Sequence, residues 1–383
     1  MKIVDIELFP IRMKPVDVGS GTAEPLPGIP PVDSVILLVK TDSSVVGFGE
    51  ATEIMSLPAH STSGLLDRLR IYTSALIGAD ALNLNEINRR LDKASKELHP
   101  ACQAARAALD MAIYDIIGKS REVPACIVLG GAYHNQMEVL MTLSEDLPEQ
   151  NAVAAKSLTD RGIRGLRVNM GNGEILTDQN IEPERQKLMA VLESVGPEIQ
   201  IDACANESWT DAGQVRSFFT SLLDDTFYGN LSVEQPLHHL DLKGHAELRE
   251  SLPIPIILNE SVLSPQTVMQ IVHSAAADRI ILNVHRVGGL SAARQIADIC
   301  EAAAIDVSIG AVASTTLGAA AHVHLASTIR DPLPVDIGDR LPSGLDPFSG
   351  GFEIVDGHII LGDEPGLGVE LEEDVLRGLA VVV

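Results

Sequence analysis

Short apolar stretches alternate with amphipathic ones from residue 137 onward. The apolar stretches have the length of buried strands and lie at 137–144, 165–171, 199–206, 231–236, 254–261, 279–285, 306–311 and 334–338. Helical spacing fills the gaps between them, for example at 214–224, 264–275 and 290–303. Strands that alternate with helices predict a parallel sheet, and eight is the number that closes a (β/α) barrel. An open doubly wound sheet is the alternative, but the chain lacks the glycine-rich loops of its nucleotide-binding versions.

The N-terminal part of the chain has a different pattern. Residues 1–50 alternate apolar and polar positions and predict an antiparallel sheet, with a Gly/Pro-rich loop at 19–31. A turn is expected at Asp42-Ser43-Ser44. Residues 60–120 change to helical spacing and end in an Ala-rich stretch that suits close helix packing.

The two patterns divide the chain into two units. After residue 350 the sequence returns to hairpin and turn signals, such as Asp356-Gly357. We therefore expect an α/β protein with an N-terminal α+β module at 1–128, joined by the segment 350–383, and a barrel at 129–349.

Composition and charge narrow the range of partners. The net charge of −25, from 28 basic and 53 acidic residues, argues against nucleic acid and against anionic membrane surfaces. The chain contains no run of 18 apolar residues, so the sequence predicts no membrane span. The alternating apolar and polar residues at the N-terminus do not resemble a signal peptide. The four cysteines lack the C-x-x-C spacing, which favours a reducing cytoplasm.

Acidic side chains stand at the ends of three predicted strands, where barrel enzymes build their active sites. These residues are Asp202, Glu234 and Glu260. Three carboxylates that converge from adjacent strands suit a hard cation such as Mg²⁺. The alternative for each of them is a helix N-cap or a salt bridge at the barrel rim.

Several stretches together resemble the enolase superfamily, in its mandelate racemase and muconate lactonizing branch. The resemblance covers the whole chain and rests on ARAALDMAIYDIIGK, VPACIVLGGA, VEQPL, LNES, HRVGGLSAARQIADICEA and PGLGVEL. It implies a TIM-like (β/α)7β barrel with an N-terminal α+β capping domain, Mg²⁺ held by acids on the third, fourth and fifth strands, and a homo-oligomer. The shared reaction of the family removes a proton from the carbon next to a carboxylate, with the metal stabilising the enolate.

The chain departs from the family pattern at both positions where relatives carry a catalytic lysine. On the second strand the family often has Lys-x-Lys, and this chain has Arg167-Val168-Asn169. On the sixth strand, Asn283 stands where relatives have a lysine, or the aspartate that partners a histidine. An amide does not titrate usefully, so neither asparagine is a general base.

One or two of the metal positions are also altered. On the third strand, relatives carry Asp-Ala-Asn shortly before a tryptophan, and this alignment places Cys204 at the position of the metal-binding aspartate. The other choice for the metal ligand is Asp202. Both residues are on the same face of the strand, so either could point into the barrel. On the fifth strand, the muconate type binds the metal through the aspartate of Asp-Glu-Ser, and this chain has Asn259 at that position. The mandelate type uses a glutamate instead, which corresponds to Glu260. Cysteine is a soft ligand and disfavours Mg²⁺.

His285 is the remaining candidate base. It follows Asn283 by two residues, so we expect it on the same face of the strand, one step nearer the barrel mouth. Imidazole has a suitable intrinsic pKa. We expect His285 to take the proton while Arg167 pairs with the substrate carboxylate; the alternative is a rim histidine bonded to a loop.

These residues favour an enzyme for metal-assisted α-proton abstraction from a small-molecule carboxylate substrate. The outcome would be racemisation, epimerisation, cycloisomerisation or the elimination catalysed by a dehydratase. One alternative is a barrel that has lost this catalysis and binds a small molecule or has a structural role. Another is metal-free chemistry with Cys204 as nucleophile or acid, beside Arg167.

Overall fold

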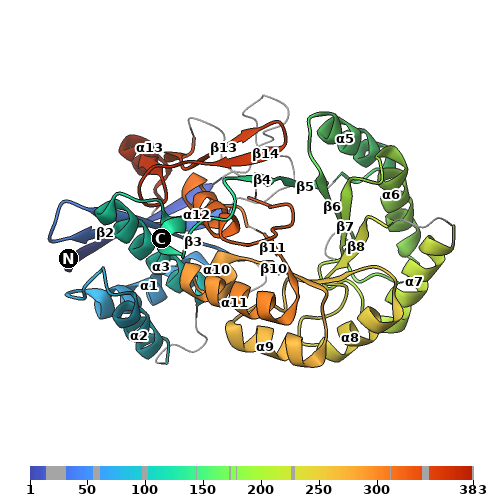
Figure 1. Ribbon diagram of the computed structural model, residues 1–383, viewed down its shortest axis with the longest axis horizontal. Helices are drawn as coiled ribbons and strands as arrows, with labels where there is room; N and C mark the ends of the chain where they lie inside the picture. Colours follow the sequence, from blue (N-terminus) through green and yellow to red (C-terminus); the bar gives the residue numbers. More distant parts are fainter. Residues whose placement is uncertain are drawn as a thin grey trace.

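The N-terminal module contains an antiparallel sheet of order β1-β2-β3, whose strands are drawn in blue in Figure 1. Its strands are β1 (Ile3–Met13), β2 (Val32–Thr41) and β3 (Val46–Thr52). The computed structural model confirms the turn predicted between the second and third strands, because Lys40 pairs with Val46 across it.

The structure describes residues 1–13, 32–54, 61–96, 102–143, 145–171, 174–177, 179–225, 229–310, 312–338 and 345–381. The Gly/Pro-rich loop predicted at 19–31 lies outside these ranges. Within them, no helix is long and apolar enough to cross a membrane.

Both faces of β2 are buried, which explains its nearly continuous apolar run. Val35, Leu37 and Val39 belong to one apolar cluster, with helices α1 (Thr62–Leu76), α2 (Leu84–Ser95) and α3 (Gln103–Arg121). The alternate residues Ile36 and Leu38 belong to a second cluster, which continues through the barrel. The sheet therefore sits between its own helices and the rest of the molecule.

The Ala-rich helix α3 lies unusually close to β3. A Cβ atom built on Gly49 would stand 1.9 Å from the carbonyl oxygen of Ala108, and one on Gly47 would stand 2.2 Å from that of Ala112. Glycine on the strand and alanine on the helix are the small residues that such an approach requires.

The second part of the molecule is a curled parallel sheet of order β11-β10-β9-β8-β7-β6-β5. All neighbouring strands pair in parallel. The strands are β5 (Leu140–Leu143), β6 (Gly165–Asn169), β7 (Gln200–Cys204), β8 (Leu231–Glu234), β9 (Ile256–Leu258), β10 (Arg279–Leu282) and β11 (Asp306–Ile309). They fall within the apolar stretches that the sequence predicted.

The segment 333–336 closes the sheet into a barrel. On one side, Val335 forms a parallel bridge with Val139, just before β5. On the other side, the amide of Asp336 donates to the carbonyl of Ile309 in β11 (2.9 Å). This segment is the eighth strand, so the (β/α)7β barrel is confirmed and the open sheet is excluded.

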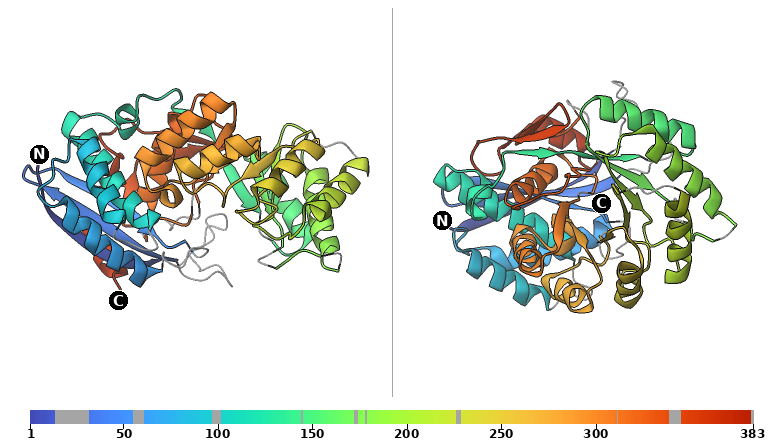
Figure 2. Two further views of the ribbon diagram at one scale, coloured as in Figure 1. Left: turned by 90° about the horizontal axis from the view of Figure 1, so that it is seen from below. Right: turned by 45° about the vertical axis from the view of Figure 1, so that its right-hand side comes forward.

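Helices surround the barrel strands (Figures 1 and 2). They are α5 (Pro148–Asp160), α6 (Ile181–Ser194), α7 (Ala212–Asp225), α8 (Leu242–Ser251), α9 (Pro265–Ser274), α10 (Val284–Val287), α11 (Leu290–Ala303) and α12 (Thr316–Ser327). The short helix α4 (Ala125–Val128) leads from the N-terminal module into the barrel.

The C-terminal segment forms small sheets that touch both parts of the molecule. Its elements, with the short strand that precedes the barrel, are β4 (Gln136–Glu138), β12 (Phe348–Gly350), β13 (Phe352–Val355), β14 (His358–Leu361), β15 (Val369–Leu371) and α13 (Glu373–Leu379). Asp356 and Gly357, both with positive φ, turn β13 into β14, as hairpin geometry requires. Ala380 bridges to Ile11 of β1. The exact domain boundaries stay predictions.

A buried carboxylate joins the N-terminal module to the barrel. Glu50 of β3 is fully buried and accepts hydrogen bonds from the Thr315 hydroxyl (2.7 Å), the Gly318 amide (3.1 Å) and the Ser34 hydroxyl (2.9 Å). It therefore caps the N-terminus of α12 from another part of the chain. Burial raises the pKa of Glu50 to about 7.

The contact between β3 and α3 predicts that Gly49→Ala is destabilising. The added methyl group meets backbone, which cannot move aside cheaply, so we expect a loss of about 1–3 kcal/mol in the free energy of unfolding. Gly378→Ala is the matched control, because a Cβ there meets nothing within 4 Å and should stabilise α13 by about 0.5–1 kcal/mol. Urea unfolding of both variants measures this; equal effects would contradict the close approach.

The raised pKa of Glu50 predicts a pH-dependent stability. The folded state holds the Glu50 proton more tightly than the unfolded state does. The stabilisation that comes from this protonation is therefore complete below about pH 4.5 and is lost as the pH rises through about 7. The loss is at most on the order of 3 kcal/mol. Urea unfolding at pH 5, 6 and 7 should show the parent losing stability relative to Glu50→Gln; a constant difference between them would refute the assignment.

Candidate active site

The barrel strands carry a row of three polar side chains at their C-terminal ends. Asn169 of β6 is paired with Cys204 of β7, which is paired with Glu234 of β8. Because side chains alternate along a strand, these three share the face that points into the barrel. Cys204 and Glu234 are buried. Burial raises the pKa of the Cys204 thiol well above its usual value, and the Glu234 carboxylate adds to this effect.

A second row lies one layer deeper in the barrel. Arg167 of β6 is paired with Asp202 of β7, and Asp202 with Ser232 of β8. The Ser232 hydroxyl donates a hydrogen bond to Asp202, and burial raises the pKa of that carboxyl group. Asp202 and Cys204 do share one face, as expected, but only Cys204 is level with Glu234.

Arg167 crosses the barrel interior and joins strands that are not neighbours. Its Nε donates to Oε2 of Glu234 (2.8 Å), and its Nη1 donates to Oδ2 of Asp336 on the closing strand (2.5 Å). Burial acts to lower the pKa of Arg167, but the two carboxylates raise it well above its usual value. The guanidinium is therefore a permanent cation inside the barrel.

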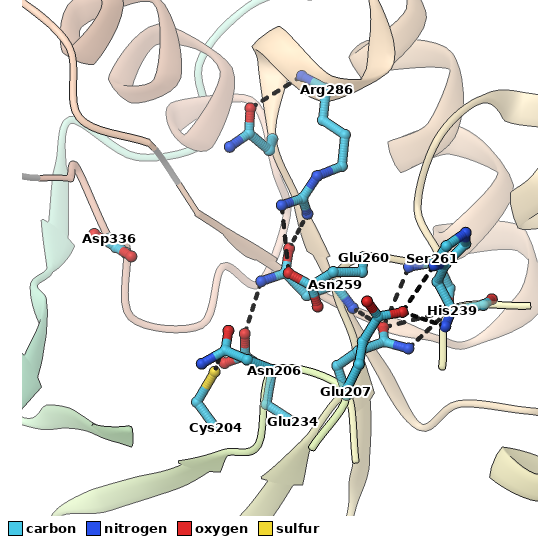
Figure 3. A network of polar contacts seen from close by, with 12 residues as sticks. Cys204, Asn206, Glu207, Glu234, His239, Asn259, Glu260, Ser261, Arg286 and Asp336 are labelled. Carbon is cyan, nitrogen blue, oxygen red and sulfur yellow. Dashed lines mark hydrogen bonds and ion pairs between the residues drawn. The ribbon is translucent and has the colours of Figure 1, made fainter. Parts of the chain in front are cut away.

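The network continues from Glu234 to the next strands (Figure 3). The Asn259 side-chain amide donates to the other oxygen of Glu234 (2.7 Å), and its carbonyl oxygen accepts from Arg286. Arg286 also lies 3.4 Å from the Glu260 carboxylate. One polar path therefore runs from Glu234 through Asn259 and Arg286 to Glu260.

Two buried atoms of this network have no hydrogen-bond partner among the described residues. They are Nη2 of Arg167, a donor, and Oε2 of Glu260, an acceptor. Burial raises the pKa of Glu260, although Arg286 opposes the effect. Buried polar groups are nearly always paired, so an unpaired donor and acceptor in one network suggest a place for a ligand.

The sixth strand ends earlier than expected, which changes the position of His285. β10 ends at Leu282, and Asn283 caps the helical turn α10 by accepting from the amides of His285 and Arg286. The expectation that His285 shares a strand face with Asn283 is therefore wrong. His285 is fully buried and packs against His322, with ring centroids 5.3 Å apart. Its role as a base stays a prediction.

The residues at the expected metal positions do not fit Mg²⁺. Cys204 presents a thiol with a strongly raised pKa, and the Asn259 amide is used between Glu234 and Arg286. Glu234 is bound to Arg167. Mg²⁺ prefers oxygen ligands in a near-octahedral arrangement, which this set does not offer.

A different donor group lies at the barrel mouth. Ligand atoms of Glu207, His238 and His239 lie within 4.8 Å of one another, the one such group of three or more among the described residues. The expected set of Asp202, Glu234 and Glu260 is not such a group. Imidazole ligands suit Zn²⁺ rather than Mg²⁺. The Nδ1 atom of His239 already contacts Glu207 at 2.7 Å.

Sequence reasoning missed Asp336 and Arg286. Asp336 lies in the predicted eighth strand, so the rule that polar strand tips face the active site could have found it. Arg286 had no comparable signal, because it belongs to a helical turn that the apolar stretch concealed.

Comparison with known proteins identifies the family. Residues 12–130 match the mandelate racemase / muconate lactonizing enzyme N-terminal domain, and residues 150–375 match the enolase C-terminal domain-like family. The chain belongs to the mandelate racemase and muconate lactonizing enzyme family of the enolase superfamily. Members of this family typically use Mg²⁺.

Similar proteins cover the chain along its whole length. An N-succinyl-L-Arg/Lys racemase from Bacillus cereus is 27% identical over 100% of this chain and 98% of its own. A hydrophobic dipeptide epimerase from Enterococcus faecalis is 29% identical over 96% of this chain and 99% of its own. The crystal structure of a dipeptide epimerase from Enterococcus faecalis V583 with Mg and the dipeptide L-Leu-L-Tyr superposes with a TM-score of 0.84, at 28% identity over 97% and 100% of the two chains.

The relatives are enzymes of two classes. Racemases, epimerases and a Pseudomonas putida muconate cycloisomerase are isomerases, and a cis-3-hydroxy-L-proline dehydratase from Roseibium aggregatum is a lyase. Membership in this family of enzymes supports an isomerase or lyase. The comparisons give no support to the alternative of a barrel without catalysis.

The position of Arg167 predicts a large stability loss in Arg167→Met. The change leaves the buried Glu234 and the partly buried Asp336 without their cation, which should cost on the order of 3–5 kcal/mol. Lys156→Met is the matched control, because the ion pair of Lys156 with Asp160 is exposed and worth at most about 1 kcal/mol. Chemical unfolding compares them; similar losses would mean that the buried network is not stabilising.

Proposed function

We propose that this family member is an isomerase or lyase that moves a proton on the carbon next to a small-molecule carboxylate. The substrate carboxylate would bind between Arg167, one layer below the C-terminal ends of the barrel strands, and Glu260, just after the end of β9. The class of reaction follows from the family, and the assignment of roles follows from the network in this chain.

The observation that carries the proposal is the pair of buried, unpartnered atoms. Nη2 of Arg167 offers a fixed donor for a carboxylate oxygen, and Oε2 of Glu260 offers an acceptor for a proton. A guanidinium can hold a carboxylate in a defined orientation, and it stabilises the negative charge that builds up on the enolate oxygens.

Glu260 is the proposed proton carrier. As a carboxylate it takes the proton from the substrate carbon, which leaves Glu260 neutral and the electron pair in the enolate held by Arg167. Return of a proton to the opposite face gives racemisation or epimerisation. Loss of a leaving group from the next carbon gives elimination. The identity of the second proton donor decides between these outcomes.

This assignment replaces the base expected from the sequence. His285 lies in α10, fully buried against His322, and so is a poor candidate to reach a bound substrate. Asn283 is used as a helix cap, and Asn169 is an amide that cannot accept a proton at neutral pH. Glu260 is a carboxylate at the end of β9 with a raised pKa, a property that suits proton transfer.

The substrate class is guided by the relatives. N-succinylated amino acids and dipeptides, which the names of two relatives indicate as their substrates, are the first compounds to test. The four cysteines are free and buried, which is consistent with a cytoplasmic location. Assembly as a homo-oligomer stays an expectation from the family.

Exchange of the α-proton in deuterated solvent tests the proposal. The parent protein is incubated with N-succinyl amino acids and dipeptides, and deuterium incorporation is followed by mass spectrometry. Glu260→Gln keeps the size of the side chain but removes the base, so exchange should slow on the order of 10²- to 10⁴-fold.

His285→Asn is the matched comparison, and we expect its exchange rate to stay near that of the parent. If Glu260→Gln exchanges as fast as the parent, Glu260 is not the base. If His285→Asn instead loses exchange while unfolding like the parent, the assignment made from the sequence is right.

A further inference from the structure

This inference deepens the proposed function, because it concerns what stabilises the bound carboxylate in the same site. Mg²⁺ supplies two positive charges among carboxylates in the family pattern. In this chain the network has three carboxylates, Glu234, Asp336 and Glu260, and two guanidinium groups, Arg167 and Arg286. The two arginines bring the same formal charge of +2 that one divalent ion would bring.

The position of the charge matters as much as its amount. Glu234 is the one acid that this chain shares with the family ligand pattern without ambiguity, and it is fully buried. Its Oε2 accepts from Nε of Arg167 at 2.8 Å. Burying a charged carboxylate is costly unless it is paired, and here the partner is the side chain of Arg167. A metal ion at Glu234 would be repelled by the adjacent guanidinium.

Asn259 fits a site built around arginine and does not fit a metal ligand set. Its amide nitrogen donates to Glu234 while its carbonyl oxygen accepts from Arg286. An amide can donate and accept at once, whereas an ionised carboxylate can only accept. An aspartate at 259 would place a second carboxylate against Glu234, which is favourable only with a cation between them.

We propose that the guanidinium of Arg167, supported by Arg286, takes the place of the divalent cation in this protein. Arg167 then neutralises Glu234 and presents its free Nη2 donor to an oxygen of the substrate carboxylate. Carboxylate binding and enolate stabilisation consequently do not require Mg²⁺. The planar fork of arginine suits this role, since it can hold Glu234, Asp336 and a ligand oxygen at once.

Metal content and thermal stability of the parent provide the first test. The protein is purified in Mg²⁺ buffer, desalted and analysed for bound metal by mass spectrometry, and its unfolding temperature is measured with Mg²⁺ and with EDTA at equal ionic strength. We expect no stoichiometric Mg²⁺ and no shift in unfolding temperature, because only a ligand of the folded state stabilises it. One Mg²⁺ per chain that is lost in Glu234→Gln would overturn the proposal.

Designed variants isolate the contribution of Arg167. Cys204→Asp with Asn259→Asp restores two carboxylates beside Glu234, and the triple variant also carries Arg167→Met. We expect the triple variant to bind one Mg²⁺ at least tenfold more tightly than the double variant, which keeps the guanidinium. Equal Mg²⁺ affinity of the two would mean that Arg167 does not occupy the position of the cation.

The Glu207, His238 and His239 group requires its own control. A transition metal that is lost in His239→Ala but kept in Glu234→Gln belongs to that group, and leaves the proposal supported. These readouts do not depend on turnover. If no α-proton exchange is found with any substrate, the proposed function fails, while the metal measurements still decide the role of Arg167.

Discussion

The buried ion pair between Arg167 and Glu234 is the interaction on which the rest of the barrel mouth depends. Glu234 has no exposure to solvent, and Arg167 is the cation that touches it and offsets the cost of burying its charge. Through its contact with Asp336, the same guanidinium links β6, β8 and the strand that closes the barrel. The side chain of Arg167 therefore both neutralises Glu234 and helps to hold the barrel closed.

This pair also explains the chemistry of its neighbours. Because Arg167 neutralises Glu234, no metal is needed to balance the charge of that carboxylate. The neighbouring positions then need no further metal ligands, so Asn259 can be an amide and Cys204 a thiol. The amide then relays the contact to Arg286, which lies beside Glu260. The changes from the family pattern are thus mutually consistent, as expected of one altered site rather than of separate losses.

The fold was largely predictable, and the site only in part. Strand stretches such as 231–236 carry their own pattern, because a buried parallel strand is apolar on both faces. Glu234 was found because strand tips converge in a barrel. The place of His285 was missed, because a helical turn begins inside the predicted strand stretch. The two partners of Arg167 lie 67 and 169 positions away in the sequence, and no local pattern predicts contacts over such distances.

A double-mutant cycle on Arg167 and Glu234 measures how strongly the two buried charges depend on each other. The free energy of unfolding is measured for the parent, Arg167→Met, Glu234→Gln and the double variant at one pH and ionic strength. We expect strong coupling, in which the double variant is far more stable than the sum of the two single losses implies, because neither charge is left buried alone. Additive losses would contradict it, since they would mean that the two groups do not depend on each other.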